Sequence, residues 1–458
     1  MDTIAAISTG NTLSAIGILR LSGPETLTVA DAVFRPADGH PLSAHPARTM
    51  VLGALLDREG RPIDQCLAVT FAAGASYTGE LSAEFHCHGS PVVLSQGLES
   101  LFAAGARQAG RGEFTKRAFL SGNLDLTQAE AVIDLIEAET AAAARSAVAQ
   151  LGGSLRRIID AVYDRLLDVS SRFYAVVDYP DEDIQDLDRA ALEAALAEAA
   201  ERLNALLATV RRGQVLRQGV PTAIVGRPNA GKSSLLNALV GYDRAIVTDV
   251  AGTTRDTVEE KAVVGDVLLR LIDTAGIRES RDQVERLGVE RSRRAMAEAG
   301  LILALVDSSL PPTGEDAALL EEVSRAGVPW VLIRSKSDLA GAPTPLTLPD
   351  GMAAPAAALS LSAHTGAGLA ELEAVVAALF PADQGQACAV LTNPRQVQAV
   401  ERAAQAAERA RAALEAGLTP DAVLTDAEEA QRALGEVTGR TVREDMVARI
   451  FDRFCVGK

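Results

Sequence analysis

The chain has 458 residues, which is too long for one hydrophobic core, so roughly two to four domains are expected. Hydrophobic residues make up 48% of it and aromatic residues only 3%, a combination that favours closely packed Ala/Leu helices over an all-β architecture. The formal net charge of −17 argues against a protein that coats nucleic acid through phosphate contacts, although a local basic patch remains compatible with it.

Neither membrane insertion nor secretion is indicated by the sequence. No stretch approaches the roughly 18 consecutive apolar residues of a membrane span, and the opening "MDTIAAISTG" lacks a basic start. The four cysteines lie far apart without a CxxC pair, so we expect a reducing cytoplasm and no disulfide framework. They are Cys66, Cys87, Cys388 and Cys455.

Residues 1–120 are predicted to form a mixed α and β domain. A helix is expected over 91–106, with Pro91 in its first turn. Short apolar or alternating runs predict four strands, over 15–23, 48–57, 64–73 and 81–87.

From residue 125 the pattern becomes helical. Apolar positions that recur at three and four predict one helix over 126–151, opened by Thr127 and Glu130 in capping-box spacing. Further helices are predicted over 154–177, 188–212, 394–416 and 442–454.

Residues 216–380 alternate short apolar strands with helices, which is typical of a parallel α/β unit. The simplest arrangement inserts this unit into a helical domain, since insertion is easy where the inserted termini lie close together. The predicted domains are therefore an N-terminal α+β domain (1–120), the first helical part (121–215), the α/β domain (216–380) and the second helical part (381–458).

"TAIVGRPNAGKSSLLNAL" contains a phosphate-binding loop. Gly226 is followed by four residues and then by Gly231, Lys232 and Ser233, between a predicted strand and a predicted helix. Glycines let backbone N–H groups surround phosphates, Lys232 reaches the β- and γ-oxygens, and Ser233 binds Mg²⁺.

The segments that follow favour guanine over adenine. In "DTAG", Asp273 can approach Mg²⁺ through water and the Gly276 N–H can meet the γ-phosphate, while Thr254 of "AGTTRD" can complete the metal shell when its loop orders. In "RSKSD", Asp338 can accept hydrogen bonds from guanine N1 and N2. The usual pattern is Asn-Lys-x-Asp, and Ser335 stands at the Asn position.

The last base-contacting loop is predicted in "SLSAH" (360–364), with His364 where Lys is common. The predicted GTP-binding residues are Asn229, Ala230, Gly231, Lys232, Ser233, Ser234, Thr248, Asp249, Val250, Ala251, Gly252, Thr253, Thr254, Asp273, Thr274, Ala275, Gly276, Ser335, Lys336, Asp338, Ser362 and Ala363.

One expected catalytic group is missing. Ras-type enzymes place a Gln directly after the "DTAG" glycine to orient the attacking water. Here that residue is Ile277, which cannot do so, and catalysis must recruit another polar group and another positive charge.

Motifs along the whole chain resemble the MnmE (TrmE) family of tRNA modification GTPases. They are "GILRLSG", "RGEFTKRAFLSGNLDLTQAEAV", "GRPNAGKSSLLNAL", "TDVAGTTRD", "DTAGIRE" followed by "VERLGVERS", and the terminal "FCVGK". The resemblance implies an N-terminal folate-binding-like domain, a helical bundle and an inserted Ras-like P-loop GTPase domain with a mostly parallel sheet.

For the GTPase, the resemblance implies stimulation by K⁺ in place of an arginine finger. Glu285 matches the residue that orients the attacking water, and Arg278 matches its support. The implied metal ligands are Ser233 and Thr254 for Mg²⁺, and Asn229, Thr248, Val250 and Thr253 for K⁺.

For the N-terminal domain, the resemblance implies contacts to a tetrahydrofolate derivative, in its 5-formyl or 5,10-methylene form. Arg20 and Glu84 match contacts to the glutamate tail and the pterin ring. Asn123 stands where the family often has a basic residue, so that contact is weaker or different here. Lys458 matches a further contact, and the chain end is expected to lie against this site with Cys455 facing the chemistry.

The implied reaction adds an aminomethyl-type group to C5 of wobble uridine 34 of certain tRNAs. The implied partners are a second copy of the chain, a MnmG/GidA-type flavoprotein that carries FAD in a heterotetramer or larger complex, and tRNA.

Several alternatives stay open at the level of sequence. A ribosome-assembly GTPase of the Era or Der kind could share the Asn-bearing phosphate loop, although such proteins usually carry a KH-like domain or a second GTPase. Cys455 could be a small core residue. His86-Cys87-His88 is better explained by strand packing than by a metal site, which wants four ligands. The basic segment 107–117 could be a solvated loop or a tRNA phosphate contact.

Overall fold

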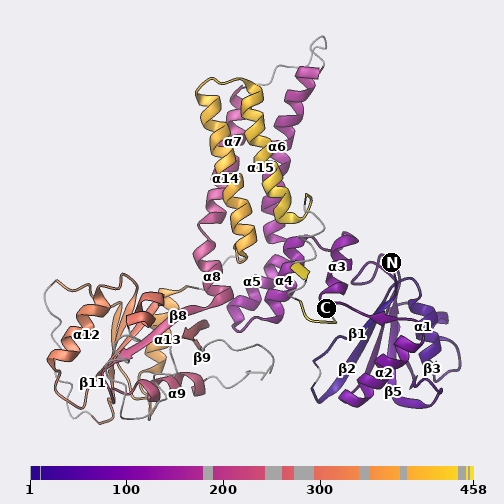
Figure 1. Ribbon diagram of the computed structural model, residues 1–458, viewed down its shortest axis with the longest axis horizontal. Coiled ribbons are helices and arrows are strands. Elements are labelled where there is room, and N and C mark those ends of the chain that lie inside the picture. The colour runs from indigo at the N-terminus through magenta and orange to yellow at the C-terminus, as the bar shows by residue number, and fades with distance from the viewer. Residues whose placement is uncertain are drawn as a thin grey trace. The chain divides into compact units, whose positions relative to one another are not determined.

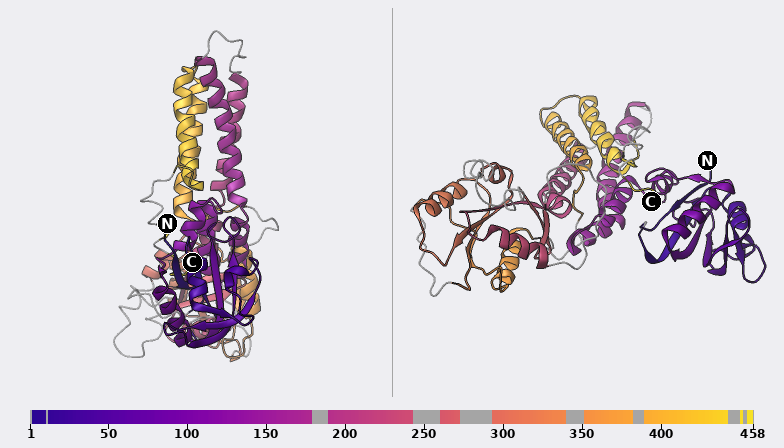
Figure 2. Two further views of the ribbon diagram at one scale, coloured as in Figure 1. Left: turned by 90° about the vertical axis from the view of Figure 1, so that its right-hand side faces the viewer. Right: turned by 60° about the horizontal axis from the view of Figure 1, so that its bottom comes forward.

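The structure is a computed structural model (Figures 1 and 2). It describes residues 2–10, 12–178, 189–242, 260–272, 293–339, 351–381, 389–441, 450–451 and 454–457. The chain divides into two compact units, the first of Met1–Ile133, Gln150–Leu203 and Ala399–Lys458 and the second of Asp134–Ala149 and Asn204–Gln398. The finer domain boundaries at residues 120, 215 and 380 stay a prediction.

The first unit contains a seven-stranded sheet in the order β3-β4-β5-β6-β2-β1-β7. All neighbouring strands are antiparallel except β1 and β7, which are parallel. The strands are β1 (Ile4–Ile7), β2 (Ser14–Ser22), β3 (Phe34–Pro36), β4 (Val51–Leu56), β5 (Pro62–Phe71), β6 (Ser82–Gly89) and β7 (Arg107–Gln108). The four predicted strands are confirmed as β2, β4, β5 and β6, whereas the others are too short to give a clear alternating pattern.

Helices α1 (Thr26–Val33) and α2 (Pro91–Ala103) cover one face of this sheet (Figure 1). Pro91 begins α2 as predicted. Leu94 and Leu101 of α2 pack with strand residues such as Leu19 and Phe85 into one buried core. Successive strand residues point to opposite faces, so the polar residues that alternate with this core lie on the other face of the sheet. A short 3-10 helix, η1 (Leu42–Ala44), precedes β4.

The basic segment from Arg107 to Arg117 has arginines at both ends, and both of them form ion pairs. The Arg117 side chain is only 5% exposed and pairs with Asp2, Glu80 and Glu113. Arg107 pairs with Asp2 and Glu113. Both guanidinium groups are paired with carboxylates of the same domain, and a tRNA phosphate contact in this segment stays a prediction. Of the three acids that pair with these arginines, only Glu113 lies in the segment itself. The sequence alone therefore did not show that the two arginines form ion pairs.

Four long helices lie side by side as a bundle (Figures 1 and 2). They are α6 (Ser154–Asp178), α7 (Arg189–Leu207), α14 (Pro394–Glu415) and α15 (Pro420–Thr438). The prediction over 154–177 is confirmed by α6 and that over 394–416 by α14. The helix predicted over 188–212 ends at Leu207, and α8 (Val210–Gln218) follows it. Helix α15 was not predicted, and most of the predicted 442–454 helix lies outside the described residues.

The single helix predicted over 126–151 is wrong. Two helices, α4 (Leu126–Ile136) and α5 (Ala141–Leu151), take its place, and α3 (Glu113–Leu120) precedes them. The capping box also begins two residues earlier than predicted. Asp125 Oδ1 accepts hydrogen bonds from the N–H groups of Thr127 and Gln128, and Gln128 Oε1 accepts one from the Asp125 N–H. Thr127 is therefore buried in the first turn rather than capping it.

The second unit contains a six-stranded sheet in the order β13-β12-β11-β8-β10-β9, parallel except for the β9–β10 pair. Its elements are β8 (Val220–Gly226), α9 (Lys232–Tyr242), β9 (Glu260–Val264), β10 (Val267–Leu271), β11 (Leu301–Asp307), α12 (Gly314–Ser324), β12 (Trp330–Ser335), β13 (Ala357–Ser360) and α13 (Leu369–Leu379). Helices α9 and α13 pack on one face, and α12 packs on the other. The predicted fold class is confirmed.

Candidate functional site

The phosphate loop connects β8 to α9, as its sequence predicts. Asn229 and Gly231 take left-handed backbone conformations, with φ of 63° and 94°, which turn the chain sharply before Lys232. Ser233 and Ser234 lie in the first turn of α9, where free N–H groups and the helix dipole favour a bound anion. The loop therefore has the geometry that phosphate binding needs.

Lys232 is held inside this loop. Its Nζ donates hydrogen bonds to the carbonyl oxygens of Gly226 and Arg227, at 2.6 and 2.8 Å. Burial lowers the pKa of the ammonium, because partial removal from water disfavours the charged form. A bound phosphate would give this partly buried cation a strong counter-charge.

A second set of contacts secures the first residue after Gly226. Arg227 pairs with Glu315 at 2.9 Å and with Asp316 at 3.2 Å. Asp316 also forms a capping box with Thr313 at the start of α12. The loop is thus tied to the helix that covers the opposite face of the sheet.

The predicted base-binding segments meet beside the loop. Ser335, at the end of β12, is buried, and its hydroxyl donates to the carbonyl oxygen of Ala230 at 2.6 Å. Lys336 Nζ pairs with Asp307 at 2.6 Å. A hydrogen bond from Ser362 lowers the pKa of Asp338, which keeps this carboxylate ionised as an acceptor for guanine N1–H and N2–H.

The described residues therefore join three of the four predicted elements, and Ala363 follows Ser362 in the third. The remaining predicted residues lie outside the described part of the chain: Thr248, Asp249, Val250, Ala251, Gly252, Thr253, Thr254, Asp273, Thr274, Ala275, Gly276, Arg278, Glu285 and Lys458. Their roles stay predictions.

A second group of predicted residues meets on the N-terminal sheet, on the face away from α1 and α2. Arg20 of β2 and Glu84 of β6 are direct cross-strand partners, and Arg20 Nε donates to Glu84 Oε1 at 2.8 Å. Both side chains are about four-fifths buried, at 20% and 17% exposure. A mostly buried cation and acid with one accessible side can bind a ligand that carries both charge and hydrogen-bond donors.

Two aromatic rings lie beside Arg20, and neither was predicted from the sequence. The Tyr77 and Phe114 rings each lie 5.7 Å from the guanidinium carbon. The Tyr77 hydroxyl contacts the Thr115 hydroxyl at 3.0 Å, and burial raises the pKa of the phenol. Aromatic residues make up only 3% of the chain, so two rings beside one charged pair stand out in the structure. The sequence alone could not show this contact, because it joins distant segments.

His86 and Asn123 also contribute to this region. His86 Nε2 lies 3.3 Å from Glu84 Oε2, so both oxygens of Glu84 have a partner. Asn123 does not pair with Arg20 or Glu84 but donates to the carbonyl oxygens of Ser76 and Tyr77, at 3.0 and 3.2 Å. It therefore secures the turn that carries the Tyr77 ring.

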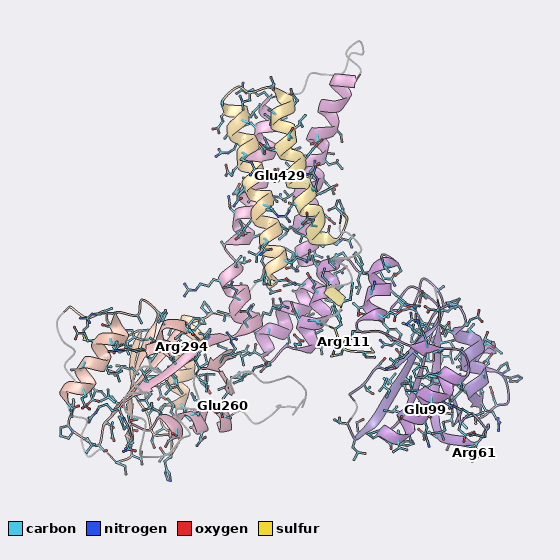
Figure 3. The ribbon with its side chains drawn as sticks, in the orientation of Figure 1. Arg61, Glu99, Arg111, Glu260, Arg294 and Glu429 are labelled. Atoms are coloured by element: carbon cyan, nitrogen blue, oxygen red, sulfur yellow. The ribbon has the colours of Figure 1, made fainter. Side chains whose placement is uncertain are left out.

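The end of the chain packs against the same domain, and its predicted position beside the folate site stays a prediction. The carbonyl oxygens of Cys455 and Gly457 accept hydrogen bonds from the Gly112 N–H and the Ser8 hydroxyl, each at 3.1 Å. The backbone of Arg111 forms an antiparallel bridge with Val456; Figure 3 labels Arg111. Cys455 is exposed, so the alternative that it is a core residue is wrong.

The segment His86-Cys87-His88 distributes its side chains over both faces of β6. Cys87 is buried in the core, whereas His88 Nδ1 contacts Asp64 Oδ1 at 2.8 Å. Among the described residues, no three His, Cys, Asp or Glu side chains form a group that could hold a metal ion. Within the same described residues, no helix is both long enough and apolar enough to cross a membrane.

The parallel sheet, the phosphate loop and the Asp338 segment define a P-loop GTPase. Comparison with known proteins identifies the family of GTPases to which the chain belongs. The profile of the MnmE helical domain matches residues 126–455, and that of the GTP-binding protein TrmE N-terminus matches residues 3–123.

Full-length relatives carry the same name. The tRNA modification GTPase MnmE of Symbiobacterium thermophilum is 42% identical over 457 residues, covering 100% of this chain and 99% of the relative. That of Chloroflexus aurantiacus is 43% identical over 461 residues, covering 100% of both. The chain therefore belongs to the MnmE family of tRNA modification GTPases, and it is a GTP hydrolase.

Proposed function

We propose that this chain is a K⁺-stimulated GTPase that modifies wobble uridine 34 of certain tRNAs in the cytoplasm. Together with an FAD-containing MnmG/GidA-type flavoprotein, it adds an aminomethyl-type group, either aminomethyl or carboxymethylaminomethyl, to C5 of that base. The observation that carries the one-carbon part of this proposal is the Arg20–Glu84 pair, with the Tyr77 and Phe114 rings beside Arg20.

The residues on the N-terminal sheet fit a tetrahydrofolate derivative. The ligand has an acidic glutamate tail and a pterin ring with N–H donors, which suit the Arg20 cation and the Glu84 carboxylate respectively. When bound, this cofactor would supply the one-carbon unit in its 5-formyl or 5,10-methylene form. Asn123 positions the turn that holds Tyr77. Cys455 and Lys458 are proposed to face the same ligand from the end of the chain.

The phosphate loop fits a Mg²⁺-bound guanine nucleotide. Lys232 would neutralise the β- and γ-phosphate oxygens, and Ser233 would provide a hydroxyl ligand for the metal together with Thr254. The left-handed backbone at Asn229 turns the chain beside the phosphates, where its side-chain oxygen is proposed to bind K⁺. A bound K⁺ would supply positive charge of the kind that an arginine finger supplies. The remaining proposed K⁺ ligands are Thr248, Val250 and Thr253.

For hydrolysis itself, we assign the orientation of the attacking water to Glu285, with Arg278 as its support. Ile277 has no polar group for this task. Hydrolysis is proposed to drive a conformational cycle rather than to make the new C–C bond at the uridine.

A homodimer formed through the N-terminal domains belongs to the proposal. On the sheet face that α1 and α2 do not cover, Ile16, Leu52 and Leu67 are 59%, 49% and 39% exposed. Leu52 and Leu67 are direct cross-strand partners, and Leu67 pairs with His86. An apolar row of this kind supports contact with a second copy of the chain.

Nucleoside mass spectrometry tests the modification. tRNA would be compared from a strain that lacks the gene and from strains complemented with the wild-type chain, Glu84→Gln or Lys232→Ala. We expect the C5-substituted wobble uridines to disappear in the deletion and to return only with the wild-type chain. Unchanged nucleosides in the deletion strain would refute the proposal.

One binding experiment and one kinetic experiment test the folate site and the K⁺ mechanism separately. Saturable binding of 5-formyltetrahydrofolate to the purified chain is expected, and no binding would remove the N-terminal site. GTP hydrolysis should be faster in KCl than in NaCl, and this difference should disappear in Asn229→Ala. Equal rates of the wild-type chain in both salts would rule out the K⁺ mechanism.

A further inference from the structure

A two-residue turn of the GTPase sheet carries a carboxylate that the nucleotide site does not use. Gly265 and Asp266 connect β9 to β10, and both have positive φ, of 60° and 61°, as a type I′ hairpin turn requires. Glycine takes this conformation without steric cost, whereas a residue with a Cβ pays for it in strain. The aspartate therefore stands where a second glycine would be less strained.

The turn lies directly against α13. A Cβ added to Gly265 would lie 2.5 Å from the carbonyl oxygen of Glu373 and 3.2 Å from Ala377 Cβ. This close approach fixes the backbone from which the Asp266 side chain extends.

The Asp266 side chain contacts the first turn of α5. Its Oδ1 accepts a hydrogen bond from the Ala142 N–H at 3.3 Å, and its Oδ2 accepts one from Arg145 at 3.2 Å. Thr140 provides a local cap, because its hydroxyl oxygen accepts a hydrogen bond from the Ala143 N–H at 3.1 Å. The start of α5 is thus capped twice, once by its own chain and once by the β9–β10 hairpin.

A second ion pair lies next to this contact. Lys261 of β9 pairs with Glu139, which precedes α5. The side chains of both ion pairs are between 38% and 56% exposed. Ion pairs of this exposure contribute little to stability, so stability alone does not explain the strained position of Asp266.

The hairpin also joins the two segments that are predicted to respond to the γ-phosphate. In the sequence, Thr254 precedes β9 and Asp273 follows β10. Helix α5 belongs to the same compact unit as the hairpin up to Ala149, and from Gln150 the chain continues in the first unit. The contact at Asp266 therefore connects the nucleotide-responsive part of the sheet to a helix that leads into the first unit.

We propose that Asp266 is a positioning residue for tRNA modification, whose carboxylate couples the nucleotide state of the β9–β10 hairpin to the start of α5. A shift of the hairpin changes the strength of this cap, and GTP hydrolysis itself does not use the carboxylate. The inference rests on the proposed conformational cycle and goes beyond it by naming the contact that transmits the nucleotide state.

Hydrogen-exchange mass spectrometry of residues 141–149 in the full chain tests this coupling. Exchange would be compared in GDP and in GDP with aluminium fluoride, each with MgCl₂ and KCl. Asp266→Gly keeps the turn conformation but removes the carboxylate, whereas Asp266→Asn keeps an acceptor for the Ala142 N–H without the charge. Glu321→Gln is the matched control, because it removes an exposed ion pair from α12 of the same unit.

In the wild-type chain, exchange of these amides should differ by about fivefold between the two nucleotide forms, the value of one helix cap. Asp266→Gly should abolish this difference, Asp266→Asn should retain part of it, and Glu321→Gln should retain all of it. The rate of GTP hydrolysis should stay within about twofold of the wild type in every variant, since a partly exposed ion pair contributes little. In the complemented deletion strain, Asp266→Gly should lower the modified wobble uridines by about fivefold or more, the lower range of an allosteric coupling.

Three results would overturn the proposal. If exchange in Asp266→Gly rises equally in both forms and the difference between them persists, the carboxylate only stabilises α5. Equal exchange of the wild-type chain in both forms would mean that α5 does not respond to nucleotide. Full restoration of the modified uridines by Asp266→Gly would show that modification does not need this contact.

Failure of the proposed function would give a different result. Modified uridines that persist in the deletion strain itself would refute the role in modification, whereas the exchange comparison would still decide whether Asp266 couples nucleotide to α5. Should Asp266→Gly fail to fold, Arg145→Gln replaces it. This variant removes the ion pair but leaves the cap on Ala142, so a smaller loss of the exchange difference is expected.

Discussion

The two candidate sites of this protein are built in opposite ways. The phosphate loop uses consecutive residues from Gly226 to Ser233, and its main groups belong to the backbone. The site on the N-terminal sheet uses side chains, and its central pair, Arg20 and Glu84, is separated by 64 positions. A backbone site depends on local sequence, whereas a side-chain site exists only after distant strands have paired. The two should therefore respond to different substitutions.

The substitution Lys232→Ala is expected to give the largest difference between the two sites, because it should affect the phosphate loop alone. Removing the partly buried cation of the phosphate loop should lower GTP hydrolysis by about 100-fold or more, since it removes charge aimed at the transferring phosphate. The affinity for 5-formyltetrahydrofolate, measured by equilibrium dialysis, should not change. Lys261→Ala, which removes a half-exposed lysine of the same sheet, is the control and should keep its activity. Substantial hydrolysis by Lys232→Ala would contradict the assignment of this lysine.

Gly112→Ala tests how the chain end is held to the N-terminal domain. Gly112 has φ of 57°, and an added Cβ would lie 2.7 Å from Phe454 Cβ and 2.9 Å from the Phe451 carbonyl oxygen. We expect local stability to fall by at least about 2 kcal/mol from backbone strain and crowding together. Hydrogen-exchange mass spectrometry of residues 110–120 measures this loss.

Gly122→Ala provides the matched control. Its φ of 80° imposes a similar strain, but an added Cβ meets no atom within 4 Å. Its cost should be about 1 kcal/mol, from backbone strain alone. Equal losses in both variants would mean that the contact with Phe454 contributes nothing.

Glu84→Gln tests the charge of the sheet site. Loss of the carboxylate should weaken 5-formyltetrahydrofolate by about tenfold, because hydrogen bonds to charged groups are stronger than neutral ones. GTP hydrolysis should be unchanged. Glu99→Gln removes an exposed carboxylate of the same domain, labelled in Figure 3, and should bind as the wild type does. A loss in both variants would point to net charge rather than to this site.

The smallest effect concerns acid stability of the N-terminal domain. Burial would raise the pKa of Glu113, but hydrogen bonds from Arg107, the Gly110 N–H and Arg117 outweigh it and lower the pKa to about 2. A lowered carboxylate pKa stabilises the folded state above the ordinary value near 4.5, and this contribution is lost as pH falls from there toward 2. In Glu113→Gln, the loss of stability between pH 6 and pH 3 in urea denaturation should be smaller. An identical acid dependence would show that the cluster does not govern it.

The contrast between the sites also explains what the sequence could reveal. The phosphate loop and the end of β12 were predicted from local patterns, because spacing alone places these groups at one edge of a parallel sheet. The Arg20–Glu84 pair came only from a family resemblance. Tyr77, Phe114 and the ion pairs of Arg117 were not predicted, since each depends on strands or helices that meet from distant parts of the chain.

The prediction of one helix over 126–151 was wrong for a local reason. The apolar spacing runs through residues 137–140, so periodicity cannot show that α4 ends at Ile136 and α5 begins at Ala141. The Asp125 cap was missed because Thr127 and Glu130 have the same spacing as Asp125 and Gln128. Only the hydrogen bonds distinguish the two.

The contact between Ser8 and Gly457 sets a time for the completion of the fold. These residues are 449 positions apart, and Gly457 packs so closely on Ile7 that an added Cβ would lie 2.2 Å from its carbonyl oxygen. At a synthesis rate of roughly 5–20 residues per second, Ser8 leaves the ribosome roughly 20–90 s before Gly457 is made. The N-terminal domain lacks this contact through that interval, while the GTPase sheet is made and can fold in between. The first domain to be synthesised is therefore among the last to be finished.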